Sequence, residues 1–570
     1  MFKKNTEHLQ ETLFGFRNDL QKKQQKELDE SEESKFYEII FCNIDEEDFA
    51  CLYSDIDSRP NAPVNALVSS LILMQKRLYT YEEFFKNLHF NLLTKTALGL
   101  QQLDEIPFCP ATLFNFQNRL SKHYAKSGEN LLEKTFDNLT IDQIKELKIK
   151  TDIQRTDSFF AASNIRNYSR LQLLVEVLIR LSRILDDTDA EYFKELLEPF
   201  VKNPSANYIY NLRASEVPHH IEKIGAIYYR LYEQLQSKYS DDPVFQIFER
   251  VYKEHFKVKN KKIEVKQPDE LMSDSLQSPD DIDATFRNKN GKKSKGQSIN
   301  IFETANPENT INLISDVSVH ANNVNEDKVL NERIDTVKEK TPNLDELHHD
   351  GAYGSFDNDK KFEELHITPV QTAIKGKTPK VELQIERINE NLYIVSCPKQ
   401  SVISETSRKR EKACFDSDVC SACPLASECP TITAKKSRVY YFTRADYLKN
   451  KRLNQINKIP TQRRKLRSNI EATVAEFTRK MPNKKLKVRG YFKTTIFAYT
   501  TAIAINFGRI FRYIPELPEK SIKTACVLGN FVKEQYFSLK KLFNYSLLLM
   551  NWWIPIKFQP NFQKHELYTL

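Results

Sequence analysis

The sequence predicts a mixed α/β fold with an all-helical N-terminal domain and a helical segment inserted between strands. Three observations lead to this prediction. Residues 1–145 carry apolar residues at three- and four-residue spacing, which is typical of helices. The period becomes two at Leu147, which indicates a strand. Helical and strand patterns then alternate over 570 residues, a length that exceeds what one hydrophobic core usually supports.

The N-terminal region shows its helical pattern best in VNALVSSLILMQKRL, YEEFFKNLHFNLLTKTAL and CPATLFNFQNRLSKHY. Pro60 and Pro63 precede the first segment, and Thr112 is placed to cap the third. A small helical domain of this kind can contain a helix-turn-helix that binds DNA, but helical bundles without DNA contact are as common. Both interpretations stay open for residues 1–145.

The first strand is predicted in LKIKTDIQRTDSFF. Its alternation places Arg155 and Asp157 on one face and Asp152 on the other, so at most one of the two aspartates serves a given site. A helical stretch at about 168–260 follows and resembles an insertion between strands.

Strand patterns resume in DATFRNKNGKKSKGQSINIFETA, where Asn290-Gly291 predicts a hairpin turn. A further strand in TINLISDVSVHA precedes a helix in EDKVLNERIDTVKEK. The next strand, in NLDELHHDG, is predicted to end at Asp350, with Gly351 allowing the turn. This order predicts a mixed sheet with helices packed on it.

Positive charge is concentrated in one segment. The formal net charge is +8, but residues 435–489 contain 18 Lys and Arg against three acids, a local +15 that leaves −7 for the rest. Binding to a phosphate backbone requires such a segment, because neutralising phosphates releases condensed counterions. The alternative is a solvated face whose charge is balanced by neighbouring acids. This alternative fits less well, because the segment contains so few acids.

The nine cysteines include a cluster in CFDSDVCSACPLASEC. Cys420 and Cys423 form a C-x2-C pair, which with Cys414 and Cys429 suits a tetrahedral structural Zn²⁺. Cys397 is an alternative to Cys414 as the fourth ligand, and free thiols are the alternative to zinc. The remaining cysteines are isolated and are expected in the core: Cys42, Cys51, Cys109 and Cys526.

Neither a secretory signal nor a membrane span is predicted. The start, MFKKNTEHLQETLFGF, has no continuous apolar run. The most apolar late stretch, Thr494–Phe507, has 14 residues, fewer than the roughly 18 to 20 that a span requires, and suits a buried helix. We expect a cytoplasmic protein, associated with the nucleoid if it binds DNA, and no membrane partner.

The segments TDSFFAASNIR, SDVSVHANNVNED, DGAYGS and RSNIEATVAEF together resemble, in this order, the successive blocks of DDE-type insertion-sequence transposases. The group has a helical N-terminal domain, an RNase H-like catalytic core and a cysteine cluster before the final glutamate. The resemblance extends from RPNAPVNALVSSLILMQKRL to FAYTTAIAINFGRI. It implies an RNase H-like core that carries the helical insertion and a Cys-rich insertion.

Carried over residue by residue, the resemblance implies a catalytic triad of Asp157, Asp350 and Glu471. We expect Asp157 near the end of its strand and Asp350 at the next strand-to-loop break, where an open sheet presents groups to a crevice. Glu471 borders a helical stripe made of Leu466, Ile470, Val474 and Phe477. Three converging carboxylates need cations to ionise together, and two Mg²⁺ ions (or Mn²⁺) about 3.5 to 4 Å apart suit them.

Each triad residue also has a structural interpretation. Asp157 suits a strand-end turn or a cap, Asp350 with Gly351 is a common turn pair, and Glu471 can pair with Arg467 one helical turn back. The competing carboxylates are Asp152, Asp316 and Glu476. His348 and His349 are adjacent on a strand and face opposite ways, so at most one lies near the site.

Arg467 matches an arginine four residues before the glutamate in related transposases and is placed to grip a phosphate. The other expected DNA contacts are Arg463, Arg464, Arg479 and Lys480. The family often has a lysine about seven residues after the glutamate, and here position 478 is Thr. That departure puts the role of this lysine, or the activity of the chain, in question.

The resemblance implies that the chain is a DNA transposase of a mobile element. It would cleave double-stranded DNA at the terminal inverted repeats and transfer the freed 3′-hydroxyls to target DNA, working as a homodimer that holds two ends. A nuclease of the same fold without strand transfer, and an inactive transposase relic that only binds DNA, are the alternatives. Five regions are expected: a helical domain at 1–145, the first part of the core at 146–390, a Cys-rich basic insertion at 391–460, core helices at 461–515 and a tail at 516–570.

Overall fold

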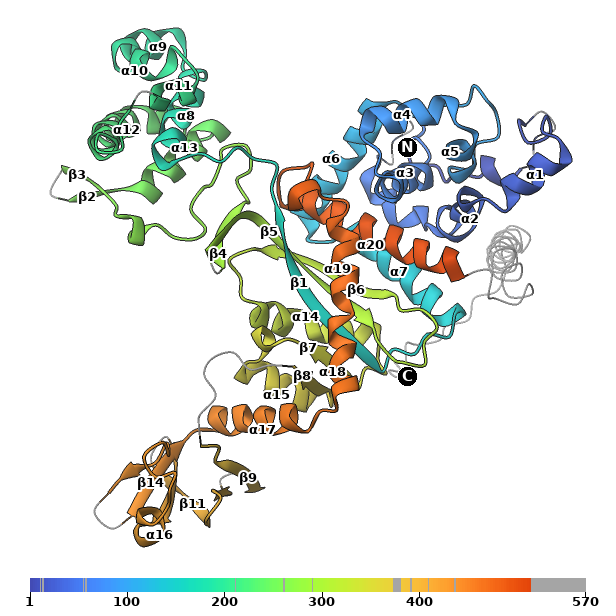
Figure 1. Cartoon of the computed structure of the whole chain (residues 1–570). Helices are drawn as coiled ribbons and strands as arrows, with labels where there is room; N and C mark the ends of the chain where they lie inside the picture. The colour runs from blue at the N-terminus through green and yellow to red at the C-terminus, as the bar shows by residue number, and fades with distance from the viewer. Residues whose placement is uncertain are drawn as a thin grey trace, which may run out of the picture.

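The computed structural model describes residues 1–513, except residues 11, 13, 14, 55, 57, 58, 211, 260, 261, 290, 373–380, 390, 391, 408, 409, 435 and 436, and except the side chains of residues 457 and 461. The expected tail at 516–570, with Cys526, and the turn residue Asn290 lie outside the described residues. The described fold is mixed α/β, as the sequence predicts (Figure 1).

In the described part of residues 1–146, all secondary-structure elements are helices. The elements are η1 (Glu7–Leu9), α1 (Lys22–Asp29), α2 (Glu32–Ile39), η2 (Phe41–Asn43), η3 (Glu46–Leu52), α3 (Val64–Arg77), α4 (Tyr81–Phe90), α5 (Leu92–Ala97), α6 (Pro110–Ser127) and α7 (Leu131–Glu146). The prediction that Thr112 caps α6 is wrong: the N-cap is Cys109 and Thr112 lies in the first turn. Pro110 takes the first helical position because its fixed φ suits it, so α6 begins earlier than predicted.

The central sheet has six strands. They are β1 (Ile153–Ala162), β4 (Thr285–Lys289), β5 (Lys292–Thr304), β6 (Ile314–Ala321), β7 (Glu346–His349) and β8 (Thr368–Gln371). Their order is β4-β5-β1-β7-β8, with β6 also paired to β5. β1 is antiparallel to β5 and parallel to β7, so the sheet is mixed. The strands on either side of Gly291, which has φ of 79°, form the predicted hairpin.

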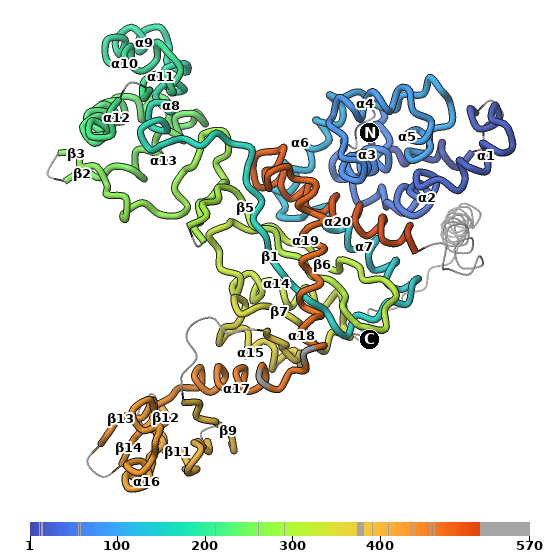
Figure 2. Tube along the Cα trace, in the orientation of Figure 1, coloured from blue at the N-terminus to red at the C-terminus, as the bar shows by residue number. Residues whose placement is uncertain are grey.

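Helices cover this sheet and join it to the N-terminal domain. They are α14 (Glu326–Lys340), η5 (Gly351–Tyr353), α15 (Phe356–Glu364), α18 (Thr461–Ser468), α19 (Ile470–Thr478), η6 (Pro482–Lys484) and α20 (Tyr491–Tyr513). α20 contains the apolar stretch Thr494–Phe507 as a buried helix and packs between α3, α7 and β6, so one core spans both regions. The trace shows α19 beside β1, distant in sequence (Figure 2). Among the described residues, no helix combines the length and apolarity of a membrane span.

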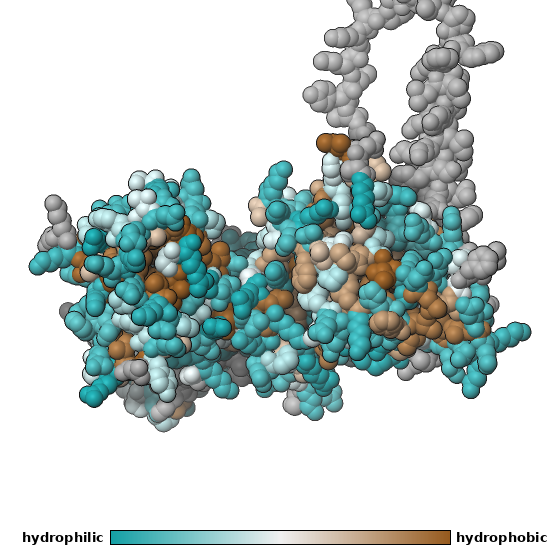
Figure 3. Space-filling view, turned by 90° about the horizontal axis from the view of Figure 1, so that it is seen from above, coloured by the Kyte–Doolittle hydropathy of each residue, from teal (hydrophilic) through white to brown (hydrophobic). Residues whose placement is uncertain are grey.

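A helical insertion follows β1 and has its own hydrophobic core. It contains α8 (Arg170–Ser182), α9 (Asp187–Tyr192), α10 (Lys194–Val201), α11 (Ser205–Tyr210), α12 (Val217–Tyr239), α13 (Pro243–His255), the hairpin β2 (Phe256–Lys259) and β3 (Lys262–Val265), and η4 (Pro268–Glu270). The insertion projects from the end of β1 (Figure 1). From above, the surface is largely hydrophilic, with apolar patches over this lobe and over the N-terminal domain (Figure 3).

A second six-stranded sheet lies between β8 and α18 in the sequence. Its strands are β9 (Gln384–Asn389), β10 (Leu392–Ser396), β11 (Ser401–Ser407), β12 (Arg410–Asp416), β13 (Ile432–Thr433) and β14 (Ser437–Phe442), with α16 (Ser417–Ser421) after β12. α17 (Arg444–Lys458) leads back to the central sheet (Figure 1). The cysteine cluster therefore belongs to a small all-antiparallel sheet.

Candidate active site

The register of β1 and β7 brings Asp157 and Asp350 together. The parallel pairs run from Ile153↔Glu346 to Arg155↔His348. Two further residues along each chain reach Asp157 and Asp350, which are therefore level. Asp350 follows β7 directly and caps η5, accepting a 2.8 Å hydrogen bond from the Ala352 N–H.

Asp157 lies in the middle of β1, and the prediction of a strand end there is wrong. β1 continues to Ala162 because it pairs with β5 over nine residue pairs, from Gln154↔Thr304 to Ala162↔Gly296. Within β1 the alternation is as predicted, because Arg155 and Asp157 share one face, together with Phe159. This face is the one that α18 and α19 cover. The strand begins at Ile153 and not at Leu147, so Asp152 lies before it.

Two contacts hold α18 and α19 on that face. Arg155 Nη1 donates a 3.0 Å hydrogen bond to the carbonyl of Leu466, and the rings of Phe159 and Phe477 pack with centroids 5.4 Å apart. Ile470 and Phe477 are buried, whereas the Glu471 side chain is 69% exposed. Glu471 thus lies at the border of the apolar stripe, beside the two aspartates.

Arg467 stands between the three carboxylates. Its Nη2 lies 2.9 Å from Asp157 Oδ2 and 3.9 Å from Asp350 Oδ2, and its Nη1 lies 3.2 Å from Glu471 Oε1. Three acids from β1, the end of β7 and α19 therefore converge on one guanidinium. The predicted Arg467–Glu471 pair is present and is one part of a four-residue cluster.

The pKa of Asp157 reflects this cluster. Burial raises the pKa of Asp157 to about 6, while Arg467 and the Ser158 N–H oppose the rise and the charges of Asp350 and Glu471 add to it. The three acids thus repel one another at short range, and Arg467 supplies part of the positive charge that they need.

The competing carboxylates lie outside this cluster. Each has an internal partner: Asn306 Nδ2 at 2.8 Å for Asp152, Arg333 Nε at 2.7 Å for Asp316 and Arg509 Nη2 at 2.6 Å for Glu476. Asp316 and Glu476 belong to ion-pair networks that join helices to the sheet. These contacts tie all three carboxylates to other parts of the fold.

Both histidines before Asp350 are buried. His348 Nε2 lies 2.6 Å from Glu346 Oε1, and the His349 ring stacks on Phe362 with centroids 5.8 Å apart. Burial lowers the pKa of His349 to about 4. His349 therefore stays neutral at physiological pH and packs as a core residue.

The predicted DNA contacts differ in exposure. Arg463, Arg464 and Arg479 are exposed, and Arg463 Nε lies 3.1 Å from Glu346 Oε1. Lys480 is half-buried and donates a hydrogen bond to the carbonyl of Gln75 in α3. Burial lowers the pKa of Lys480 to about 8. The structure thus gives Lys480 a partner within the chain, which weighs against a DNA contact.

The structure separates Cys414 from the other cysteines of the cluster. On β12, Ala413 and Phe415 face the core of the small sheet, which Cys397 and Cys420 also pack against. By alternation Cys414 points to the opposite face, where it interacts with the side chain of Lys412.

Cys420 instead has three thiols as neighbours. Burial raises the pKa of Cys420; Arg438 opposes the rise, and the nearby Cys397, Cys429 and Cys423 add to it. Backbone turns present them: the Cys397 N–H donates to the Gln400 carbonyl at 2.9 Å and the Cys423 N–H to the Cys420 carbonyl at 3.2 Å.

In the described part of the chain, no group of three or more His, Cys, Asp or Glu side chains is arranged so that it could hold a metal ion as it stands. The triad nonetheless offers the hard oxygen donors that Mg²⁺ prefers, around a point that Arg467 already neutralises. The carboxylate oxygens are ligands of the type that a divalent cation takes. Arg467 would have to move away from them for the ion to bind.

Two residues of the site have no role in the sequence-based predictions. Arg155 anchors α18 through the carbonyl of Leu466. The sequence indicates a role for Arg155 only through its position, two residues before Asp157 on a buried strand. Tyr353, in DGAYGS, is fully buried near Asp157 and donates a 2.7 Å hydrogen bond to Asn300. Only the folded structure shows that Tyr353 lies near Asp157 and contacts Asn300.

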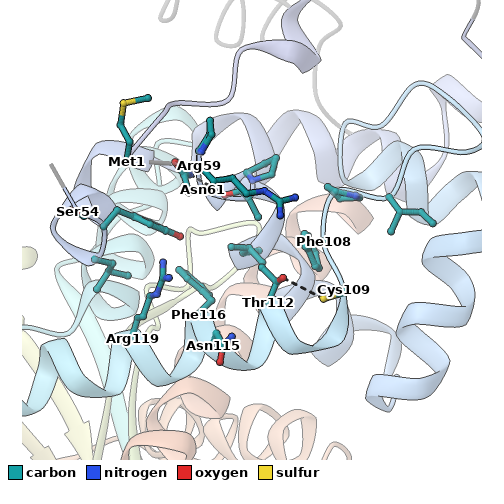
Figure 4. A pocket seen from close by; sticks show the side chains of 18 residues that line it. Met1, Ser54, Arg59, Asn61, Phe108, Cys109, Thr112, Asn115, Phe116 and Arg119 are labelled. Carbon is teal, nitrogen blue, oxygen red and sulfur yellow. Dashed lines mark hydrogen bonds between the residues drawn. The ribbon is translucent and has the colours of Figure 1, made fainter. Parts of the chain in front are cut away.

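A separate hollow of about 960 Å³ lies in the N-terminal domain (Figure 4). Arg119, on α6, lies over the Tyr53 ring at 4.9 Å, and Cys109 contacts Thr112 at 3.4 Å. None of the triad residues lines this hollow. It is therefore distinct from the carboxylate cluster.

Comparison with known proteins adds one match. Residues 395–511, about a fifth of the chain, match the family described as "Transposase DDE domain". This range includes Cys397, Arg467 and Glu471 but neither aspartate of the triad. Neither the curated proteins nor the solved structures contain a match.

Proposed function

We propose that the chain is a DDE-type insertion-sequence transposase, which cleaves DNA at the ends of an insertion sequence and transfers them to target DNA. The match of residues 395–511 to a transposase DDE domain supports this proposal. The observation that carries this proposal is the convergence of Asp157, Asp350 and Glu471 on Arg467. The central sheet, with β1 between an antiparallel and a parallel neighbour, supports an RNase H-like core.

The three carboxylates would hold two divalent cations, Mg²⁺ or Mn²⁺, which activate the attacking oxygen and stabilise the leaving oxygen. Asp157 is held by the sheet and Asp350 by its cap on η5, so both offer oxygens in set positions. Glu471 is exposed and can turn toward the cluster. Arg467, displaced from the acids, would bind a phosphate of the substrate through its planar fork of donors.

The test is cleavage of DNA that carries the flanks of the gene, with Mg²⁺ and with EDTA. We expect metal-dependent cuts at the end boundaries by the wild type, none by Asp350→Ala, and DNA binding by both. Asp345→Ala is the matched control, because Asp345 is an exposed acid five residues earlier, beside the same strand. Cutting by Asp350→Ala at the wild-type rate would refute the assignment.

Strand transfer is tested separately with pre-cut ends and a supercoiled target. Joined products support a transposase, and cuts without joining support the nuclease alternative. Binding without cutting under either condition supports the inactive relic. A homodimer that holds two ends is part of the proposal, and sedimentation with end DNA measures it.

We also propose a structural Zn²⁺ in the small sheet, held by Cys397, Cys420, Cys423 and Cys429. Four thiols suit tetrahedral zinc and leave no open position. Two donors already point at these sulfurs: Gln400 Nε2 lies 3.4 Å from Cys420 Sγ and Thr431 Oγ1 lies 3.3 Å from Cys429 Sγ. Such hydrogen bonds support metal-bound thiolates.

A further inference from the structure

A groove of about 1300 Å³ lies where β1 ends and the helical insertion begins. Its walls come from five parts of the chain: the end of β1 with the following loop, the start of α8, His255 with the segment from Pro268 to Gln277, the β4–β5 hairpin, and η6 with Lys485. In Figure 1 this place lies between the core hairpin and the projecting insertion. No site described above includes it.

The charge of the groove has one sign. Its described lining contains no Asp or Glu, and it contains seven cationic side chains: Arg170, Lys289, Lys292, Lys293, Lys295, Lys484 and Lys485. Walls of one sign concentrate a ligand of the opposite sign, because the low-dielectric protein focuses the field. The groove therefore suits a polyanion.

Several of these cations lack a neutralising partner. In the described part of the chain, the side chains of Lys292, Lys293 and Lys484 have neither an ion pair nor a hydrogen bond, and all three are exposed. Of the other four, Lys289 pairs with an acid, its Nζ lying 3.3 Å from Glu326, whereas Arg170, Lys295 and Lys485 donate hydrogen bonds to uncharged groups. Burial, with the nearby Lys293, lowers the pKa of Lys295.

The wall of the groove that η6 forms is held in a fixed conformation. Asn483 and Lys484 both have positive φ, 55° and 58°, which L residues rarely adopt and which surrounding structure must enforce. The Leu486 N–H donates a 2.8 Å hydrogen bond to the Ala162 carbonyl, which fixes this turn against β1. Lys485 Nζ donates to the carbonyl of Ile165 at 3.1 Å and closes the same corner.

The groove is within reach of the carboxylate cluster. Five residue steps along β1 lead from Asp157 to Ala162, which is about 17 Å at the usual rise of a strand. A DNA duplex advances 3.4 Å per base pair, so this span equals about five base pairs. A duplex that runs along β1 with its cleaved bond at Asp157 would therefore place its flanking base pairs at the groove.

We propose that this groove binds the sugar–phosphate backbone of the duplex that flanks the cleaved bond, which rests on the proposed transposase function. The insertion and the core hairpin then hold the DNA together, and Lys292, Lys293 and Lys484 contact phosphates. Such contacts carry no sequence information, and they set the position of the duplex on the protein.

The test compares two double variants of the full chain. Lys292→Gln with Lys293→Gln removes two exposed cations of the groove, and Lys194→Gln with Lys202→Gln removes two exposed cations of the insertion outside it. Binding of a fluorescein-labelled duplex is measured in EDTA by anisotropy over a range of salt concentrations. We expect the groove variant to bind about five- to tenfold more weakly, with a salt slope smaller by about 2, and the control to match the wild type.

The possible outcomes distinguish failure of the groove proposal from failure of the proposed transposase function. A groove variant that binds like the control overturns the groove and leaves the transposase proposal standing. A wild type that does not bind duplex DNA, or that prefers RNA of the same length, overturns both. A weaker, less salt-dependent groove variant that still cleaves at the wild-type rate at saturating DNA supports a positioning role.

Discussion

Arg467 Nη2 lies 2.9 Å from Asp157 Oδ2, although 310 residues separate the two in the sequence. The same guanidinium reaches Asp350 and Glu471, so one cation balances three acids. A metal ion would need the same carboxylate oxygens. Arg467 and the metal therefore compete for one position.

This competition predicts that Arg467→Gln binds Ca²⁺, a probe that resembles Mg²⁺ in its ligands, about tenfold more tightly than the wild type. The reason is that the carboxylates no longer have an internal counter-charge. Isothermal titration calorimetry measures the affinity. Arg463→Gln is the control, because Arg463 lies on the same helix and pairs with Glu346 outside the triad. Equal Ca²⁺ affinity in the wild type and Arg467→Gln would contradict the competition.

Glu303→Ala should destabilise the protein by about 3 to 5 kcal/mol. Glu303 is fully buried and pairs with Arg155 at 2.6 Å and with Arg509, so its removal leaves Arg155 without an acid and Arg509 with Glu476 alone. Urea denaturation measures the loss. The control is Glu308→Ala, which removes an exposed pair with Lys150 and should cost at most about 1 kcal/mol. Similar losses in the two variants would argue against a buried ionic anchor.

Gly296→Ala should cost clearly more than Gly291→Ala. A Cβ at Gly296, where φ is 148°, would lie 2.3 Å from the carbonyl oxygen of Ala161 and force β5 away from β1. At Gly291 only the positive φ opposes a side chain, which costs roughly 1 to 2 kcal/mol. Thermal unfolding of the two variants measures the difference, and equal melting temperatures would show that β1 and β5 can separate at this point without cost.

Cys397→Ser should lose bound zinc, and Cys414→Ser should keep it. Cys397 neighbours Cys420, whereas Cys414 faces away from the cluster with Lys412. Zinc released from the reduced full chain by a thiol-reactive reagent and detected by a chelating dye measures the content, with about one ion per chain expected in the wild type. Loss of zinc in Cys414→Ser alone would reverse the ligand set, and a wild type without zinc would remove the site.

The helical insertion should lose stability in acid through His255. Burial lowers the pKa of His255 to about 3, with Arg170 and Lys266 adding to the effect. The neutral ring is thus favoured in the folded state, so its stabilisation is complete above the ordinary pKa of 6.5 and is lost as the pH falls toward 3.

His255→Gln should therefore unfold with a smaller dependence on pH between about 6.5 and 4 than the wild type does. Circular dichroism during urea denaturation at several pH values measures this dependence. His219→Gln is the control, since His219 is an exposed histidine on α12 of the same insertion. An unchanged pH dependence in His255→Gln would assign the acid sensitivity to other groups.

The periodicity of the sequence was enough to predict the main elements. The strand that contains Asp157, the hairpin around Gly291 and the strand that ends before Asp350 are all present. Periodicity shows which face of an element is apolar. Because burial of that face stabilises the element, the pattern predicts where helices and strands form. It does not report how far a ladder extends, which is why the end of β1 was misplaced: pairing with β5 carries the strand past Asp157 to Ala162.

The sequence by itself determined the mixed α/β class, the order of the elements and the family resemblance, because local periodicity and motif order are properties of neighbouring residues. Only the tertiary structure decided that Asp157 and Asp350 lie level, since this depends on the register of two strands far apart in the chain. It alone placed Arg467 among three acids, turned Cys414 away from the cysteine cluster and gathered seven cations in one groove. Each of these relationships joins segments whose distance in space is set by packing, and packing is not written in the local pattern.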